Sequence, residues 1–103
     1  MNADSLHPVS PDVTVVRNDE RSQYELWVGD VLSGLITFRS RPERIVMIHT
    51  EVDERLEGQG LGGRLVSGAL DDVRARGLRV TPLCPFVAAY IREHPVYADL
   101  VAT

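Results

Sequence analysis

The segment Leu56–Val66, with the sequence LEGQGLGGRLV, places four glycines among six consecutive residues, at Gly58, Gly60, Gly62 and Gly63. A strand-like run, RIVMIHTEV, precedes this segment, and an apolar pattern at helical spacing follows it. The unpaired N–H groups at a helix N-terminus carry partial positive charge, and glycines let such a backbone approach an oxygen-rich group closely. The segment therefore predicts a loop that binds a phosphate or pyrophosphate; the alternative is a tight turn that binds no ligand.

Three of these glycines also match the dinucleotide-binding fingerprint G-x-G-x-x-G, namely Gly58, Gly60 and Gly63. That fingerprint needs an acidic residue about 20 residues further on to bind the ribose. No acidic residue occurs between Asp72 and Glu93, and the letters DERLE separate the glycines from their strand. The sequence therefore argues against a nicotinamide dinucleotide and leaves other pyrophosphate ligands open.

Periodicity predicts five strands and two helices in the order β-β-β-β-α-β-α. The predicted strands span residues 12–18, 22–28, 31–39, 44–52 and 78–84. One helix carries the apolar stripe Leu61, Leu65, Ala69 and Val73 and ends before Gly77, and the other spans residues 85–94. The first four strands are expected to be mainly antiparallel, and the strand–helix–strand unit makes a parallel crossover. The predicted fold class is α/β or α+β with a mixed sheet of about five strands.

Alternation along the strand 44–52 assigns the odd-numbered side chains, including His49 and Glu51, to one face and the even-numbered ones to the other. Both faces are apolar where this strand begins, which predicts a central strand covered on both sides. Its polar side chains gather at the C-terminal end, where open α/β sheets bind ligands.

Length and composition limit the remaining possibilities. The chain of 103 residues suits one domain, expected at residues 11–103 after a flexible tail at residues 1–10. A net charge of −4 argues against a general nucleic-acid-binding role. The single cysteine forms no internal disulfide, and no apolar run approaches the about 20 residues of a membrane span. We expect a cytoplasmic protein that binds neither nucleic acid nor membrane, as a monomer or weak dimer.

The glycine segment resembles the signature Q/R-x-x-G-x-G/A of the GNAT superfamily, the acyl-CoA-dependent N-acetyltransferases. Gly60 and Gly62 match its two small-residue positions, whereas Glu57 departs from the first position. Arg55 and Arg64 are near enough in the sequence to supply charge instead. The longer run from HTEV to PLCPFVAAYIREHPVY resembles a subfamily of small, minimal GNAT-like proteins.

The resemblance implies a minimal GNAT fold that transfers an acetyl group from acetyl-CoA to an amine, on a peptide or protein or another acceptor. It implies that the CoA pyrophosphate binds at Val52, Glu57, Gly58, Gln59, Gly60, Leu61, Gly62, Gly63 and Arg64, with no metal. Two helices that larger GNAT proteins insert between their first two strands have no counterpart here, which predicts an open acceptor side. The same departure also fits a non-catalytic CoA-binding module.

Cys84 is a candidate catalytic residue because it ends a predicted strand and precedes a helix, whose N-terminus favours a thiolate. Pro82 removes a donor from the strand ladder, so pairing with the neighbouring parallel strand is expected to loosen there. The resemblance implies that the pantetheine arm of CoA lies in this gap. The alternative is an inert buried cysteine.

Three further candidates could move protons. His49 or Glu51 could accept a proton from an amine, directly or through water, and His49 could also pair with Cys84. The resemblance implies that Tyr90 protonates the departing CoA thiolate, while helical spacing with Phe86 and Ile91 suggests packing instead. The remaining polar positions of the first helix, Asp71, Asp72, Arg74 and Arg76, are typical of a solvated face.

Overall fold

A single five-stranded sheet in the order β1-β2-β3-β4-β5 forms the base of the structure, a computed structural model that describes residues 12–56 and 58–102. The predicted tail at residues 1–10 lies outside the described residues. The strands are β1 (Val13–Asn18), β2 (Gln23–Val28), β3 (Val31–Ser40), β4 (Arg44–Val52) and β5 (Arg79–Pro82). The helices are α1 (Leu61–Ala75) and α2 (Pro85–Glu93), with 3₁₀ turns at η2 (Glu54–Leu56) and η3 (Pro95–Leu100). The predicted element order is confirmed.

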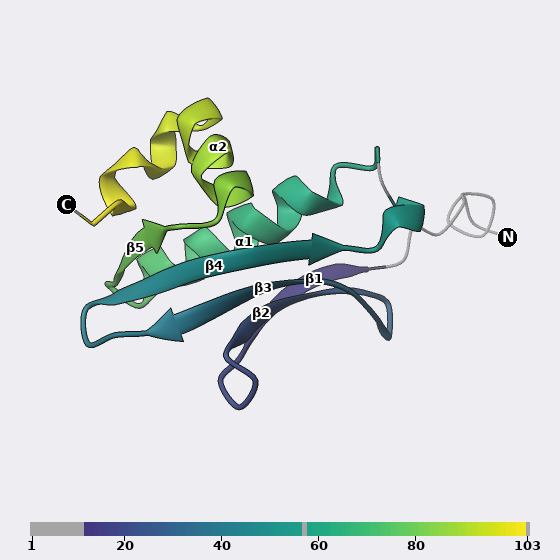
Figure 1. Cartoon of the computed structure of the whole chain (residues 1–103). Coiled ribbons are helices and arrows are strands. Elements are labelled where there is room, and N and C mark those ends of the chain that lie inside the picture. The colour runs from purple at the N-terminus through teal and green to yellow at the C-terminus, as the bar shows by residue number, and fades with distance from the viewer. Residues whose placement is uncertain (1–11, 57, 103) are drawn as a thin grey trace, which may run out of the picture.

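The strands pair as the sequence predicts, antiparallel from β1 to β4 and parallel between β4 and β5. The parallel pairing starts at Arg44 with Arg79 and ends at Met47 with Pro82. β5 is therefore shorter than the predicted strand 78–84, because a proline nitrogen donates no hydrogen bond to a ladder. Beyond this point β4 and β5 diverge, and β5 leads into α2 (Figure 1).

Both helices lie on the same side of the sheet, with α1 running along it and α2 above the β4–β5 end (Figure 1). The predicted apolar stripe of α1 faces the sheet and is buried at Leu61, Leu65, Val66, Ala69, Leu70 and Val73. The other face of β4 carries no described helix, and Ile48 is 38% exposed there. The expectation that β4 is covered on both sides is therefore wrong.

A β-bulge in β4 changes which side chains share a face. Phe38 pairs with Met47 while the preceding Thr37 pairs with His49, so Ile48 is the extra residue. Met47 is fully buried under the helices, and the inserted residue reverses the alternation after it. Thr50 and Val52 consequently face the helices, whereas His49 and Glu51 lie on the open face. The prediction that His49 shares a face with Met47 is wrong.

Helix α1 ends as the sequence predicts. Gly77 adopts a left-handed φ of 70°, and its N–H donates to the Arg74 carbonyl at 3.0 Å. The Leu78 N–H donates to the Val73 carbonyl at 3.0 Å, which completes a Schellman motif.

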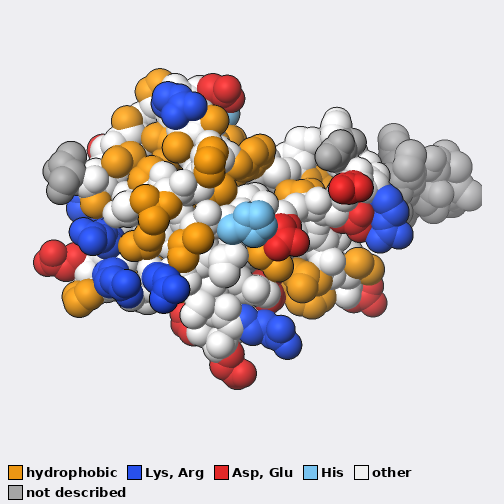
Figure 2. Space-filling view, in the orientation of Figure 1, with side chains coloured by type: hydrophobic (Ala, Val, Ile, Leu, Met, Phe, Trp, Pro, Cys, Tyr) orange, Lys and Arg blue, Asp and Glu red, His pale blue; other side chains and the backbone are white. Residues whose placement is uncertain are grey.

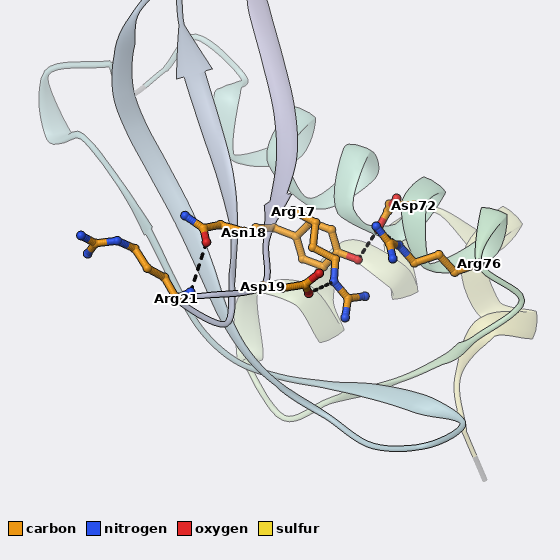
Figure 3. A network of polar contacts seen from close by, with 7 residues as sticks. Arg17, Asn18, Asp19, Arg21, Asp72 and Arg76 are labelled. Atoms are coloured by element: carbon orange, nitrogen blue, oxygen red, sulfur yellow. Dashed lines mark hydrogen bonds and ion pairs between the residues drawn. The ribbon is translucent and has the colours of Figure 1, made fainter.

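The polar side of α1 is not simply solvated, in contrast to the prediction. The Tyr24 hydroxyl donates to Asp72 Oδ2 at 2.6 Å, and Arg76 Nε donates to the same oxygen at 2.7 Å. Burial, with Asp72 beside the phenol, raises the pKa of Tyr24. Arg17 completes the cluster in Figure 3, with its Nε 2.6 Å from Asp19 Oδ1. The Tyr24–Asp72 hydrogen bond ties β2 to α1.

The C-terminal turn η3 packs on the same helix. Arg74 binds both carboxylate oxygens of Asp99 at 2.9 Å, and the Tyr97 hydroxyl donates to Asp71 Oδ1 at 2.8 Å. Burial and the Asp71 carboxylate raise the pKa of Tyr97 to about 12, so the hydroxyl keeps its proton as a donor. Tyr97 is therefore a structural anchor. None of the described helices is long and apolar enough to cross a membrane.

A buried carboxylate on β2 is a feature that periodicity does not reveal. Glu25 is 5% exposed and accepts hydrogen bonds from Gln23 Nε2 at 2.6 Å, Asn18 Nδ2 at 3.0 Å and Trp27 Nε1 at 3.1 Å. Burial alone would raise the pKa of Glu25, but these three donors and the charge of Arg21 outweigh it and lower the pKa.

We predict that Glu25→Gln lowers the free energy of unfolding at pH 7 by about 1–3 kcal/mol. The NH₂ group of the new amide would face the three N–H donors that now bind the carboxylate, and buried polar groups would be left without a hydrogen-bond partner. A lowered folded-state pKa gives stability that is present above the ordinary value of 4.5 and is lost as pH falls through the folded value. Urea unfolding at pH 7 and in acid measures the difference. The exposed Glu20→Gln should show neither effect, and an equal deficit of the Glu25 variant at both pH values would contradict the prediction.

Candidate functional site

Two glycines set the path of the loop into α1. Gly58 and Gly60 have φ values of 83° and 73°, a left-handed conformation that L side chains rarely adopt. Gly60 is the N-cap residue of α1, and its carbonyl accepts the first helical bond from the Arg64 N–H at 3.2 Å. The N–H groups of Leu61 to Gly63 precede that bond, and no described side chain caps them. The helix N-terminus is therefore open to an anion.

The other two glycines face α2. A Cβ atom on Gly62 would lie 2.8 Å from Cζ of Phe86, which is too close, so Gly62 makes room for the start of α2. A Cβ atom on Gly63 would lie 3.4 Å from Cε2 of Tyr90, an ordinary contact. Two of the four glycines therefore shape the loop, and a third, Gly62, permits the close approach of α1 and α2.

A cleft of about 380 Å³ lies where the loop, the end of β4 and the start of α2 meet. Its lining residues are Thr50, Val52, Leu56, Gly58, Gly60, Leu61, Gly62, Gly63 and Phe86. Ligand sites commonly have volumes of about 300–1,000 Å³. Six of the predicted cofactor-binding residues therefore line one cleft: the four glycines, Val52 and Leu61.

The cleft opens where β4 and β5 separate. The N–H groups of Leu83 and Cys84 both donate to the Met47 carbonyl at 3.0 Å, and no β5 residue pairs with β4 after this point. The predicted loosening at Pro82 is confirmed. Within the described part of the chain, the β4 edge from residue 48 to 52 is unpaired on the β5 side, which leaves backbone groups for a ligand.

Cys84 lies at the base of this opening as the N-cap residue of α2. Its side chain is 4% exposed, and Sγ is 3.3 Å from Thr50 Oγ1 in a hydrogen bond that either group can donate. Thr50, which the sequence does not single out, also lines the cleft. The bulge therefore brings Thr50 rather than His49 beside Cys84, and the expected pairing of His49 with Cys84 is not formed.

His49 and Glu51 form a pair on the open face, with His49 Nε2 3.2 Å from Glu51 Oε2. Their side chains are 60% and 66% exposed. A second hollow, lined by residues 32–35 and 50–54, includes Glu51 and shares Thr50 and Val52 with the cleft. The end of β4 thus separates two concave surfaces, one on the helix side and one on the open face.

Tyr90 is half-buried and packs between aromatic neighbours. Its ring stacks on His94 with centroids 3.9 Å apart, and its centroid lies 6.1 Å from that of Tyr97. Tyr90 is not among the residues that line the cleft. Phe86 is 47% exposed and lines the cleft, so the prediction that it joins Ile91 on a core-facing stripe is wrong.

The nearby cations differ in their availability. Arg55 donates to both carboxylate oxygens of Asp53, at 3.1 Å and 2.7 Å, and these hydrogen bonds lower the pKa of Asp53. Arg64 is exposed on the first turn of α1 and forms no ion pair within the described residues. Gln59 is exposed in the loop, and Glu57 lies outside the described residues. Among the residues that the structure describes, no group of three His, Cys, Asp or Glu side chains is placed to hold a metal ion.

Known proteins share both the sequence pattern and the fold. A sequence model described as GCN5-related N-acetyl-transferase matches residues 23–100. No functionally curated protein matches. A GCN5-like protein from Staphylococcus aureus has a solution structure that is similar at a TM-score of 0.66 and 22% identity, over 86% of this chain and 87% of that chain. Ard1 from Thermoplasma volcanium is similar at a TM-score of 0.54 and 20% identity, over 76% of this chain and 57% of that chain. At these identities the two structures support the predicted fold alone.

Proposed function

Because the chain belongs to the GCN5-related N-acetyltransferase family, we propose that it transfers the acetyl group of acetyl-CoA to an amine. The observation that carries this proposal is the cleft between the unpaired end of β4 and the open N-terminus of α1. One end of the cleft offers backbone N–H groups to an anion, and the other end reaches Thr50 beside Cys84. A long ligand with a charged end and a reactive end fits this arrangement.

In this proposal, the pyrophosphate of CoA binds at the loop from Gly58 to Gly63, where the N–H groups before the first helical bond stabilise it. Val52 and Leu61 contact the ligand from the cleft walls, and Gln59 and Arg64 supply polar and positive groups from its rim. The unpaired β4 edge binds the amide groups of the pantetheine arm. The thioester then lies near Thr50 and Cys84.

We propose that the acceptor amine attacks the thioester directly. His49 accepts a proton from the amine, with Glu51 orienting the ring, and the C–S bond breaks as the C–N bond forms. The CoA thiolate leaves with the electron pair of the broken bond, and Tyr90 stays the predicted proton donor to it. The deep burial of Cys84 argues against its thiol as the nucleophile.

The acceptor approaches from the open face in this scheme and reaches the thioester through the opening where β4 and β5 separate. His49 and Glu51 are mostly exposed beside the second hollow, and no described helix covers them. An exposed base suits an amine on a peptide or protein better than a small molecule that must be enclosed. The acceptor is therefore proposed to be macromolecular.

Intact-protein mass spectrometry after incubation with acetyl-CoA, combined with a CoA-release assay over a panel of amines, tests the proposal. We expect amine-dependent CoA release, no acetyl adduct on the wild-type chain, and a slower but measurable rate in Cys84→Ala. Side-chain background is low because the chain contains no lysine. An adduct that requires Cys84 would instead establish an acyl-cysteine route. Acetyl-CoA binding without amine-dependent release would identify a binding module.

A further inference from the structure

Three arginines converge on one cleft at the end of the sheet opposite the glycine loop. Arg41, Arg44 and Arg79 line this cleft of about 450 Å³, and Pro42, Glu43 and Ala102 complete the lining. Figure 2 shows basic side chains gathered at this end of the molecule, where the β3–β4 turn and the start of β5 lie in Figure 1. We call the surface formed by Arg41, Arg44 and Arg79 the arginine cleft.

The backbone fixes the positions from which these side chains extend. The Arg41 N–H donates to the Arg44 carbonyl at 2.9 Å and closes the turn between β3 and β4. Arg44 and Arg79 are direct partners at the start of the parallel β4–β5 pairing. Arg41 Nη1 binds the Ser40 carbonyl at 3.1 Å, and Arg79 Nη2 binds the Val101 carbonyl at 3.0 Å. Each of these two guanidinium groups retains further N–H donors.

The arrangement is electrostatically unfavourable without a ligand. Like charges on paired strand positions destabilise a sheet, and Arg44 and Arg79 are such a pair. None of the three arginines forms an ion pair with a carboxylate of the described residues, and Glu43 is the one acidic residue in the described lining. The chain has a net charge of −4, so a general excess of positive charge does not explain the cluster.

We propose that the arginine cleft binds a compact, phosphate-bearing small molecule. Guanidinium groups match phosphate oxygens through paired N–H donors, and a polyphosphate removes the repulsion between neighbouring arginines. The cleft has the volume of a small-ligand site and is confined to one end of the sheet, which favours a compact ligand over an extended chain. The negative net charge disfavours nucleic acid.

Binding at this cleft would hold together the two strands whose far ends separate to form the glycine-loop cleft. Arg44 begins β4 and Arg79 begins β5, so one bound anion bridges both strands where they pair. A ligand that binds only the folded chain also raises its thermal stability. The arginine cleft shares no lining residue with the glycine-loop cleft, and the proposal stands whether or not acetyl-CoA binds there.

Backbone amide NMR during titration of the full chain with inorganic tripolyphosphate at low ionic strength tests the proposal. We expect saturable shifts at residues 41, 43, 44, 79, 80, 101 and 102, separable by position from any shifts at residues 58–64 caused by binding to the glycine loop. A rise in melting temperature should follow the same saturation curve.

Substitutions of one exposed arginine at a time show whether the cleft or the overall charge is responsible. Arg44→Gln should weaken tripolyphosphate binding about tenfold, the loss expected for one charge-assisted contact at an exposed site. Arg44→Lys should give an intermediate affinity because the charge remains but the paired donors are lost. Arg92→Gln, a change at another exposed arginine on α2, should leave the affinity unchanged.

Two results would overturn the proposal. Shifts confined to residues 58–64 would place the anion at the glycine loop alone. Equal weakening by Arg44→Gln and Arg92→Gln would indicate a diffuse charge effect without a site. The amide spectrum of each variant without ligand verifies that the fold is retained, so a loss of binding reports on the cleft.

Discussion

Replacing His49 with alanine is expected to lower kcat/KM for amine acetylation by about 10²–10⁴-fold, the usual contribution of a positioned general base. Acetyl-CoA affinity should not change, because the bulge turns His49 to the open face while the cofactor cleft lies on the helix side. Initial rates of CoA release over a range of amine concentrations give kcat/KM. A separate acetyl-CoA titration gives the dissociation constant.

Glu51→Gln distinguishes an orienting role from that of the base. The amide still accepts a hydrogen bond from His49 but lacks the charge that stabilises a protonated ring, so we expect a smaller loss than in the His49 variant. Glu20→Gln, in the turn between β1 and β2, is the matched change that should leave the rate unaltered. A full amine-dependent rate in the His49 variant would place the base elsewhere. Loss of acetyl-CoA binding would show that His49 acts through the structure of the site.

Alternation along β4 is correct only as far as Met47. The bulge at Ile48 depends on how β4 pairs with β3, and the letters of β4 alone do not reveal it. The side chains after the bulge consequently exchange faces, so Thr50 contacts Cys84 and His49 faces solvent. The sequence identifies the polar end of this strand correctly, but its assignment of side chains to faces fails from His49 to Val52 because of the bulge.

Features that depend on local chemistry are predicted well. Gly77 ends α1 in a left-handed conformation, as the predicted helix end requires. Features that depend on contacts between residues far apart in the sequence are not predicted. Gly62 permits the contact with Phe86 on α2, and Asp72 accepts a hydrogen bond from the hydroxyl of Tyr24 on β2. Helical periodicity places these residues on a helix but does not identify what approaches them.

Helix α1 packs against Val15 of β1 at Gly68, and Gly68→Val is expected to lower the free energy of unfolding by about 1–3 kcal/mol through overpacking. A Cβ atom at Gly68 would lie 2.7 Å from Cβ, 2.8 Å from Cγ2 and 3.0 Å from Cγ1 of Val15. Val15 cannot move aside easily because its branched side chain is stiff at χ1 and its backbone belongs to β1. Urea unfolding of the variant and the wild type measures the loss.

Gly63→Ala is the matched control on the same helix. Its new methyl would make an ordinary contact at 3.4 Å with Tyr90, and alanine favours a helix over glycine by about 1 kcal/mol, so stability should hold or rise. Adding Val15→Ala to Gly68→Val should recover part of the loss, because the double variant removes the methyl groups that collide. Recovery is the decisive measurement, because valine has a better helix propensity than glycine, so a loss must come from the new contact, which a shorter residue 15 relieves. An additive double variant would therefore show that α1 and β1 have room to separate at this crossing.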